Sequence, residues 1–597
     1  MNSINNNEKK ERRIIIIDFE VLSKVGFWMV CMKDYKTKTE HTIINDRKEF
    51  IRIFNKNKDA VWVGYNIKGY DQWIMKAIIA GIDPCIVSDK LIQEKLSGWK
   101  IDRSLNKIKL LLFELSSGMR SLKELELFMG EDIRETTVPF DLMTYPTQLQ
   151  IDELKIYCLH DVRMTYKVFE ETYYEYEAQL GLIKYFDFSP EMLNKTKAQL
   201  SATILGAKKN NFDRNDDFEF EIVDTLKLDK YKNIKEWYLN MENRKYNTSC
   251  RCIIYGLETD FGWGGLHCAR KKYQAEGFIV NSDVSSFYPS LMIEYNMLSR
   301  NVTNPHKFKE IKQTRIKFKE EKNPIEKSLK IVLNSTYGSS KDINNDLYDP
   351  MMGNAVCVNG QLLLLDLIEK VELEFKDNAE FIQGNTDGVM FKFNCKEDVK
   401  RYIEICKEWS IRTRMDLEHD FIEKIIQKDV NNYIFIQDNG KIKSKGAYVK
   451  KLSLIDNDLP IINKALVEKL LNDVSIEDTI NNTTDLIDFQ KCVKVSNKYG
   501  YAVYGSEKIN LKVIRVFASK SLSDFAIMKV KHGNLPEKIA NTPDRVFIDN
   551  NKVIGKEIPD YLDKNWYIKL ANKRLDDFVC ENNFTLFDYL DNVNLLR

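Results

Sequence analysis

The sequence lacks the features that mark several specialised classes of protein. Its eleven cysteines include no CxxC pair, and the one CxC, formed by Cys250 and Cys252, has no nearby histidines. This spacing argues against a zinc site, and unpaired cysteines fit a reducing cytoplasm. No apolar run approaches the length of a membrane span, so we do not expect contact with a membrane.

An excess of charge is also missing. Lysine and arginine together number 90, and aspartate and glutamate number 89. This balance does not exclude a partner as acidic as DNA, because acidic metal sites and basic grooves in one enzyme cancel in the sum. A hydrophobic content of 43% and a charged content of 30% exclude fibrous and disordered classes, but they indicate no function.

The length predicts several packed units. At about 150 residues per domain, the 597 residues suggest about three to five of them. Residues 1–13 are polar and charged and contain no apolar core, so they predict a flexible tail and not a signal peptide. Short β-branched runs and a long helical stretch follow, which is typical of an α/β domain.

Acidic residues follow the apolar runs of this N-terminal third. Asp18 and Glu20 come after the run RIIII, Asp71 closes YNIKGYD, and Asp161 lies one helical turn after Tyr157 in YCLHD. We expect the first two acids at a strand end, pointing the same way. Four carboxylates from separate elements repel one another unless a strong cation lies between them, and two Mg²⁺ ions, with Mn²⁺ as an alternative, are the natural candidates.

A second pair of acids lies in the middle of the chain. FIVNSDVSSFYPS predicts a strand that ends at Asp283, and FIQGNTDGVMFKF predicts a β-hairpin that turns near Asp387. Between them, residues 307–337 predict two helices that break near Asn323 and Pro324. The sequence therefore predicts a helical hairpin between two strands that each deliver a carboxylate.

The N-terminal motifs DFE, NIKGYD and YCLHD resemble those of the DnaQ-like exonuclease family. A lone DxE or YxxxD is usually a solvated pair, but three such motifs in this order are rare by chance. The resemblance implies a 3′→5′ exonuclease whose four acids hold the metal ions while Tyr157 orients a water. It also implies contacts to a single-stranded primer end from Asn66, Tyr70, Ser121 and Leu122.

The central motifs DVSSFYPS, KIVLNSTYG and GNTDG resemble motifs A, B and C of family B DNA polymerases, and the whole arrangement resembles the bacteriophage enzymes. The resemblance covers about residues 14–450 and implies a template-directed DNA polymerase with proofreading. The implied metal ligands are Asp283, the backbone carbonyl of Val284 and Asp387. These would hold two metal ions for nucleotidyl transfer.

The same resemblance implies roles around the incoming nucleotide. Lys330 would meet the triphosphate, Tyr337, two helical turns later, would pack on the nascent base pair, and Tyr288 would exclude the ribose 2′-hydroxyl. Arg315 and Lys319 could add charge to the phosphates, or could simply form a solvated helix face. The remaining implied nucleotide-binding residues are Ser286, Phe287 and Asn334.

Other matches to the family are looser. FGWGGLH resembles the YxGG region only in its glycine pair, Gly264 and Gly265, which implies a template contact. QKDVNNY resembles the KxY primer motif, but an asparagine stands where lysine is expected, so Lys428 is the alternative and Tyr433 would pack on the primer. In KSKGAYVKK, Lys445 resembles a residue that grips the DNA backbone.

The resemblance implies a multidomain α/β and α+β fold, with an RNase H-like exonuclease domain followed by a right-handed polymerase of palm, fingers and thumb. The expected ranges are 1–13 for the tail, 14–185 for the exonuclease, 186–302 for linking helices and the first part of the palm, 303–338 for the fingers hairpin, 339–428 for the second part of the palm, and 429–597 for the thumb and C-terminal region.

The expected partners are primer–template DNA, deoxynucleotides, and replication factors such as a helicase, a primase and a single-strand-binding protein. We expect a monomer in the cytoplasm of an infected bacterium. Only 46 residues separate Asp283 from Lys330, which leaves no room for the insertion of protein-primed relatives and predicts a nucleic-acid primer. Two alternatives stay open: a nuclease whose polymerase site has decayed, suggested by Asn385 in motif C, and a non-catalytic DNA-binding scaffold.

Overall fold

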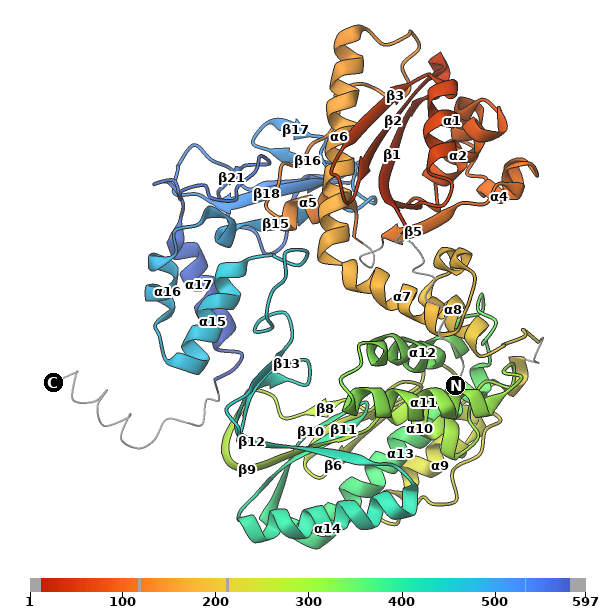
Figure 1. Ribbon diagram of the computed structural model, residues 1–597. Coiled ribbons are helices and arrows are strands. Elements are labelled where there is room, and N and C mark those ends of the chain that lie inside the picture. The colour runs from red at the N-terminus through yellow and green to blue at the C-terminus, as the bar shows by residue number, and fades with distance from the viewer. Residues whose placement is uncertain (1–11, 116–119, 211–213, 532, 580–597) are drawn as a thin grey trace, which may run out of the picture. The chain divides into compact units, whose positions relative to one another are not determined.

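The computed structural model describes residues 12–115, 120–210, 214–531 and 533–579 (Figure 1). The chain forms two compact units, and neither is a continuous stretch of sequence. Unit 1 combines Met1–Thr196 with Leu452–Pro460 and Thr483–Lys564, and unit 2 combines Lys197–Lys451 with Ile461–Asn482 and Asn565–Arg597. The range 429–597, expected as one C-terminal region, is thus divided between the two units.

A five-stranded sheet in the order β3-β2-β1-β4-β5 forms the centre of unit 1. Its strands are β1 (Ile14–Leu22), β2 (Phe27–Asp34), β3 (Glu40–Ile44), β4 (Val61–Tyr65) and β5 (Leu111–Leu115). Strand β1 runs antiparallel to β2 and parallel to β4. The apolar residues of β1 are buried, so the β-branched run gains its stability from burial on the sheet faces.

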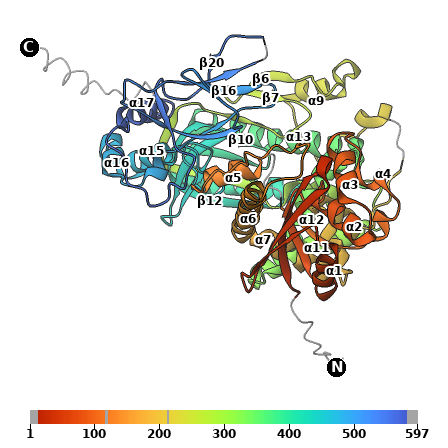
Figure 2. The ribbon, with the colours of Figure 1, turned by 90° about the horizontal axis from the view of Figure 1, so that it is seen from above.

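Helices cover both faces of this sheet. They are α1 (Arg47–Lys56), α2 (Asp71–Ala80), α3 (Pro84–Ile92), α4 (Gly98–Ile101), α6 (Gln148–Glu171) and α7 (Tyr173–Tyr185). Figures 1 and 2 show α6 on the face opposite α1 and α2. Helix α6 packs on β1 and β2, and α2 packs on β1, so the elements that carry the N-terminal acids are in contact.

The strand β1 differs from expectation in its length. Asp18 and Glu20 lie inside the strand, paired across to Cys31 and Met29 of β2, and not at its end. The strand continues because Phe19, Val21 and Leu22 are buried apolar residues that extend its contact with the core. The two acids still project from one side, as their spacing of two requires.

The C-terminal part of unit 1 is built of short strands. One sheet contains β15 (Lys491–Lys494), β18 (Val513–Ala518) and β21 (Val546–Ile548), and another contains β17 (Glu507–Ile509), β16 (Tyr501–Tyr504), β19 (Ile527–Val530) and β20 (Glu537–Lys538). Helix α5 (Leu122–Phe128) contacts both β15 and β18 as well as α6. This C-terminal β region therefore supports a helix that lies almost 400 residues earlier in the chain.

Unit 2 is organised around a seven-stranded sheet in the order β14-β13-β12-β9-β11-β10-β8. The strands are β8 (Cys268–Ala269), β9 (Tyr273–Val284), β10 (Ala379–Asn385), β11 (Gly388–Phe393), β12 (Leu417–Asp429), β13 (Asn432–Gln437) and β14 (Ile442–Lys445). Helices α13 (Pro350–Phe375) and α14 (Lys396–Thr413) pack against it. The antiparallel pair β10 and β11 confirms the predicted β-hairpin.

The predicted helical hairpin is confirmed as α11 (Pro305–Glu320) and α12 (Ile325–Ser340), which pack on each other. The short helix α10 (Phe287–Glu294) follows β9, and it contacts both α11 and α12. The other α-helices described in unit 2 are α8 (Lys197–Ile204), α9 (Lys232–Leu239), α15 (Pro460–Asn472), α16 (Ile476–Asn482) and α17 (Lys564–Leu575). In addition, strand β6 (Cys250–Ile254) pairs with β7 (Leu257–Phe261).

Helix α13 corrects one expectation from the sequence. Within the described residues, the segment Pro350–Asn378 is long and apolar enough to cross a membrane, although we expected no such run. However, 89% of its most apolar window is buried inside the protein, so the helix is a core element of unit 2. Its apolar character reflects burial on all sides.

Candidate active sites

The acids predicted in unit 1 come together beside the second half of β1. Asp18 and Glu20 extend from β1, Asp71 is the first residue of α2, and Asp161 lies in the middle of α6. The backbone N–H of Phe19 donates to Asp71 Oδ1 at 3.2 Å, which ties α2 to the strand beside the two acids. The fold thus gathers all four carboxylates from three separate elements.

These carboxylates lie in a setting that opposes their ionisation. Burial, with the charge of Asp161 adding to it, raises the pKa of Asp18 to about 8. Burial and the neighbouring acids also raise the pKa of Glu20 and of Asp71 well above the usual range. The pKa of Asp161 rises to about 6, mainly through burial. Only a bound cation can make four such groups charged together at neutral pH.

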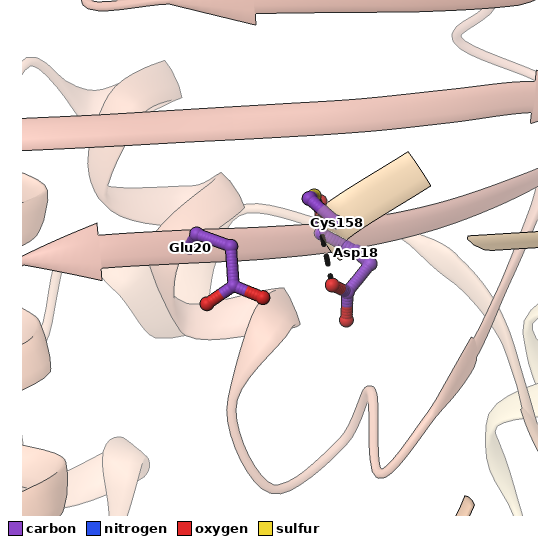
Figure 3. Close-up of side chains that lie close together, drawn as sticks. All are labelled: Asp18, Glu20 and Cys158. Atoms are coloured by element: carbon purple, nitrogen blue, oxygen red, sulfur yellow. Dashed lines mark hydrogen bonds between the residues drawn. The ribbon is translucent and has the colours of Figure 1, made fainter. Parts of the chain in front are cut away.

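The donor set fits a divalent metal ion. Glu20 is 7% exposed, and its carboxylate has no hydrogen-bond partner among the described residues. Figure 3 shows that the Asp18 and Glu20 carboxylates project from the same side of β1. Oxygen ligands of this kind are those that Mg²⁺ and Mn²⁺ prefer.

Lys123, on α5, is part of this site, although sequence reasoning did not find it. Its Nζ donates to Asp161 Oδ1 at 2.6 Å and to Glu126 Oε1 at 3.1 Å, and lies 4.7 Å from the centre of the Tyr157 ring. The charge of this ammonium lowers the pKa of Asp161 against the effect of burial. Ser121 and Leu122 are predicted primer contacts, so the lysine that follows them in the sequence is the signal that could have identified Lys123.

The predicted primer contacts in unit 1 lie next to the ends of β4, α2 and α5. Ser121 caps α5, since its side chain accepts from the N–H of Glu124 in a capping box. Asn66 is exposed and adopts a left-handed conformation, with φ of 61°. The Tyr70 hydroxyl lies 2.8 Å from Ser88 Oγ. Leu122, the first residue of α5, is half-buried.

In unit 2, the predicted nucleotide-binding residues line one cavity of about 450 Å³. Asp283 stands at the end of β9, and Asp387 lies in the turn between β10 and β11. The N–H of Val284 donates to the carbonyl of Asp387 at 2.7 Å, which locks the two segments together. The other predicted residues that line this cavity are Val284, Ser286, Phe287, Tyr288, Arg315, Lys319, Lys330, Asn334 and Tyr337.

The glycine after Asp387 permits the two acids to approach. Gly388 pairs with Asp283 across the strands, and a Cβ at this position would lie 2.0 Å from Asp283 Oδ1. Burial, followed by the charge of Asp387, raises the pKa of Asp283 to about 6. Two acids held this close need a cation between them when both are ionised.

Helices α10 to α12 supply the cationic and aromatic wall of the cavity. Ser286 adopts a left-handed conformation, with φ of 50°, and its Oγ accepts from Arg315 Nη1 at 3.2 Å. The rings of Tyr288 and Tyr337 lie 4.4 Å apart between centroids. Lys330 is exposed to the cavity, where an anionic ligand can reach it.

Glu418 is a cavity residue that sequence reasoning missed. It pairs directly with Asp283 in the register of β12 and β9, and its Oε1 lies 3.6 Å from Lys319 Nζ. Ser285 Oγ donates to the same oxygen at 3.1 Å. No local motif marks this glutamate, because its place depends on the pairing of strands that are more than 130 residues apart.

A second cavity of unit 2, of about 630 Å³, shares both acids with the first. Tyr433, Lys443, Lys445, Lys450 and Lys451 line it, together with Asn385. Asn385 Oδ1 accepts from the N–H of Thr386 at 2.9 Å, within the hairpin turn. The concentration of lysines makes this cavity a candidate for binding a phosphate backbone.

Lys428 does not line this cavity. Its Nζ lies 3.1 Å from Asp577 Oδ2 and 4.2 Å from the centre of the Tyr448 ring. Of the glycine pair, Gly265 packs against the hairpin turn, where an added Cβ would lie 2.5 Å from Thr386 Oγ1, while Gly264 has open space around it. The FGWGGLH segment is thereby placed beside Asp387.

Comparison with known proteins finds a distant similarity to archaeal DNA polymerases over about a third of the chain. No protein-family profile matches the sequence. The chain is 24% identical over 212 residues to DNA polymerase 1 of Sulfolobus acidocaldarius, covering 35% of this chain and 23% of that protein. It is 22% identical over 210 residues to DNA polymerase 1 of Sulfurisphaera ohwakuensis, again with 35% and 23% covered.

The matched segment thus spans about a quarter of the length of these relatives. Among solved structures, the family B DNA polymerase of Pyrobaculum calidifontis is similar at 14% identity and a TM-score of 0.43, with 96% of this chain and 79% of that chain covered.

Proposed function

We propose that the chain is a template-directed DNA polymerase with its own 3′→5′ proofreading exonuclease, and that it copies a phage genome from a nucleic-acid primer. The observation that carries the proposal is the 450 Å³ cavity, in which Asp283 and Asp387 face the basic side chains of α11 and α12. A triphosphate needs this combination of a carboxylate-held metal site and an opposed cationic wall. The distant similarity to archaeal DNA polymerases supports the same function.

In the proposed polymerase site, Asp283, Asp387 and the carbonyl of Val284 would hold two Mg²⁺ ions, whose charge would favour deprotonation of the primer 3′-hydroxyl and neutralise pyrophosphate. Lys330 and Arg315 bind the triphosphate oxygens. Tyr337 packs on the nascent base pair. Tyr288, whose ring contacts that of Tyr337, lies under the sugar. The ammonium of Lys319 lies 3.6 Å from Glu418 Oε1, and from this position it can turn to bind the phosphates.

In the proposed exonuclease site, Asp18, Glu20, Asp71 and Asp161 would hold two metal ions, whose charge would activate an attacking water and stabilise the leaving oxygen. Tyr157 orients that water through its hydroxyl. Burial and the surrounding carboxylates raise the pKa of Tyr157, so the phenol stays protonated and can donate a hydrogen bond. Lys123 holds Asp161 in place.

We further propose that the five-stranded sheet of unit 1 is the RNase H-like exonuclease module, and that unit 2 forms the palm, with α11 and α12 as fingers. Primer backbone phosphates would lie along the lysines of the 630 Å³ cavity, with Tyr433 under the primer end. The expected partners remain primer–template DNA and the replication factors of an infected bacterial cytoplasm.

Extension of a 5′-labelled primer tests the proposal, since one gel reports both activities. With Mg²⁺ and all four deoxynucleotides we expect longer products, and without nucleotides we expect shorter ones. A protein that only shortens the primer would support the decayed-polymerase alternative, for which Asn385 is the motivation. A protein that does neither would be a DNA-binding scaffold.

A further inference from the structure

A thiol lies among the acids of unit 1. Cys158, on α6, is one residue after Tyr157, and its Sγ is 3.6 Å from Asp18 Oδ2 and 3.5 Å from the Asp18 carbonyl (Figure 3). One ligand atom each from Asp18, Glu20 and Cys158 lie within 4.8 Å of one another. The three groups are therefore close enough to share a single ion.

A second observation points to a ligand at the same place. The Glu20 side chain is buried, it makes no hydrogen bond among the described residues, and it faces the Asp18 carboxylate (Figure 3). A buried carboxylate without a partner is costly, and a cation bound beside Glu20 would offset that cost. The thiol lies on the border of the space that this cation would fill.

Sulfur changes which ions such a site prefers. Mg²⁺ takes hard oxygen ligands and leaves a thiol protonated, whereas Zn²⁺ and Cd²⁺ bind thiolate strongly. We propose that Asp18, Glu20 and Cys158 form a binding site for a thiophilic divalent cation of the Zn²⁺ and Cd²⁺ class, which competes with Mg²⁺ at the exonuclease centre. The competition rests on the proposed exonuclease function, while the binding itself rests on geometry alone.

The binding step is a ligand exchange without oxidation or reduction. The S–H bond of Cys158 breaks, its proton leaves to the buffer, and the sulfur lone pair forms the bond to the metal ion. The hydrogen bond from Cys158 to Asp18 is lost at the same time, which frees Asp18 Oδ2 for the ion. Two carboxylates and one thiolate then hold the ion.

The test is titration of the full chain with Cd²⁺, monitored by the ultraviolet charge-transfer absorption of a cadmium–thiolate bond. Other cysteines contribute to this absorption, so the quantity of interest is the difference between the wild type and Cys158→Ser. Cys85→Ser is the matched control, because Cys85 is also buried in unit 1 but donates to the Phe27 carbonyl, away from the acids. We expect the wild type and Cys85→Ser to share an absorption component that Cys158→Ser lacks.

The double variant Asp18→Asn with Glu20→Gln should lose the same component while keeping all its cysteines. It also keeps the proposal testable if Cys158→Ser does not fold, which thermal unfolding monitors. An equal absorption in wild type and Cys158→Ser, or in wild type and the double variant, would overturn the proposed site.

A second readout is inhibition of primer degradation by Cd²⁺ at fixed Mg²⁺, with each variant referred to its own rate in Mg²⁺. We expect Cys158→Ser to need at least about tenfold more Cd²⁺ for half inhibition. A cadmium–thiolate component without any Mg²⁺-dependent degradation would retain the metal site but reject the exonuclease function. Degradation with the same Cd²⁺ sensitivity in both proteins would reject the metal site and retain the function.

Discussion

At the scale of single residues, Lys123 is the cation that pairs both with Asp161 of the proposed exonuclease site and with the buried Glu126. Replacement by methionine leaves Asp161 and the fully buried Glu126 without their shared cation. We expect Lys123→Met to reduce primer degradation by at least about 100-fold, or about 2.7 kcal/mol, with extension unchanged. Because Lys123 lowers the pKa of Asp161, the residual activity should also shift to higher pH.

Single-turnover degradation of single-stranded DNA over a range of pH measures this effect. Lys123→Arg, which keeps the charge, should recover part of the rate. Lys494→Met is the control, because Lys494 pairs at 2.6 Å with Glu124 on the same helix but is half exposed to solvent. Equal rates for Lys123→Met and Lys494→Met would exclude a positioning role for Lys123.

Tyr288 has the place required for discrimination against ribonucleotides. Its ring centroid lies 4.4 Å from that of Tyr337, and a Cβ added at Gly360 of α13 would lie 3.4 Å from the ring, so these neighbours restrict its movement away from a 2′-hydroxyl. We expect Tyr288→Val to increase ribonucleotide incorporation by at least about 100-fold relative to deoxynucleotides. The ratio of kcat/KM for the two nucleotides measures this, and Tyr295→Val, on the same segment but outside the cavity, serves as control. An unchanged ratio would remove Tyr288 from this role.

Asn385 and Asp387 should contribute unequally to polymerisation. The Asn385 side chain stabilises the hairpin turn by accepting from Thr386, whereas Asp387 lines both cavities with Asp283. We expect Asn385→Ala to reduce the rate at most about 100-fold, and Asp387→Ala about 1000-fold or more. Pre-steady-state extension measures both. Equal losses would make Asn385 a metal ligand in its own right.

At the scale of elements, helix α5 depends on a buried arginine from the distant C-terminal strands. Arg515 on β18 is fully buried, and its guanidinium donates to the carbonyls of Leu127 and Glu131 at the end of α5. Arg515→Met removes the side-chain donor of the Glu131 carbonyl and leaves the Leu127 carbonyl only its backbone donors, among them the N–H of Gly130, so we expect a loss of about 3 kcal/mol in the stability of unit 1.

Exonuclease activity should fall with this destabilisation, because α5 carries Lys123. The stability and activity of Arg515→Lys should lie between those of the wild type and Arg515→Met, because one ammonium group cannot replace all the N–H donors of the planar guanidinium. Arg545→Met, at an exposed site of the same region, is the control. Thermal unfolding measures the change in stability, and primer degradation measures the change in activity. An Arg515→Met protein as stable as the control would contradict the structural role proposed for Arg515.

The same elements show what the sequence could and could not predict. The strand of Asp283, the hairpin of Asp387 and the helix pair between them follow from local periodicity, and the structure gathers their side chains around one cavity. The association of β15 and β18 with α5 could not be predicted, because long-range pairing leaves no local pattern. Lys123 and Glu418 were missed for the same reason, since each acts through partners on other elements.

At the scale of the whole molecule, the two proposed activities belong to separate compact units, each with its own core. Asp18 and Glu20 lie on β1 of unit 1, whereas Asp283 lies on β9 of unit 2. No element carries acids of both sites. The chemistry of one site should therefore be removable without loss of the other.

We expect Asp18→Ala with Glu20→Ala to abolish primer degradation and to leave the extension rate within about twofold of wild type. Conversely, Asp283→Ala should abolish extension and leave degradation intact. Removal of two buried acids that repel each other lowers the electrostatic energy of the folded state. In the absence of metal, the Asp18→Ala, Glu20→Ala protein should therefore be at least as stable as the wild type. Extension and degradation of one labelled primer by all three proteins measure the separation. If extension fell in parallel with degradation in the first variant, the assignment of the two activities to two sites would be wrong.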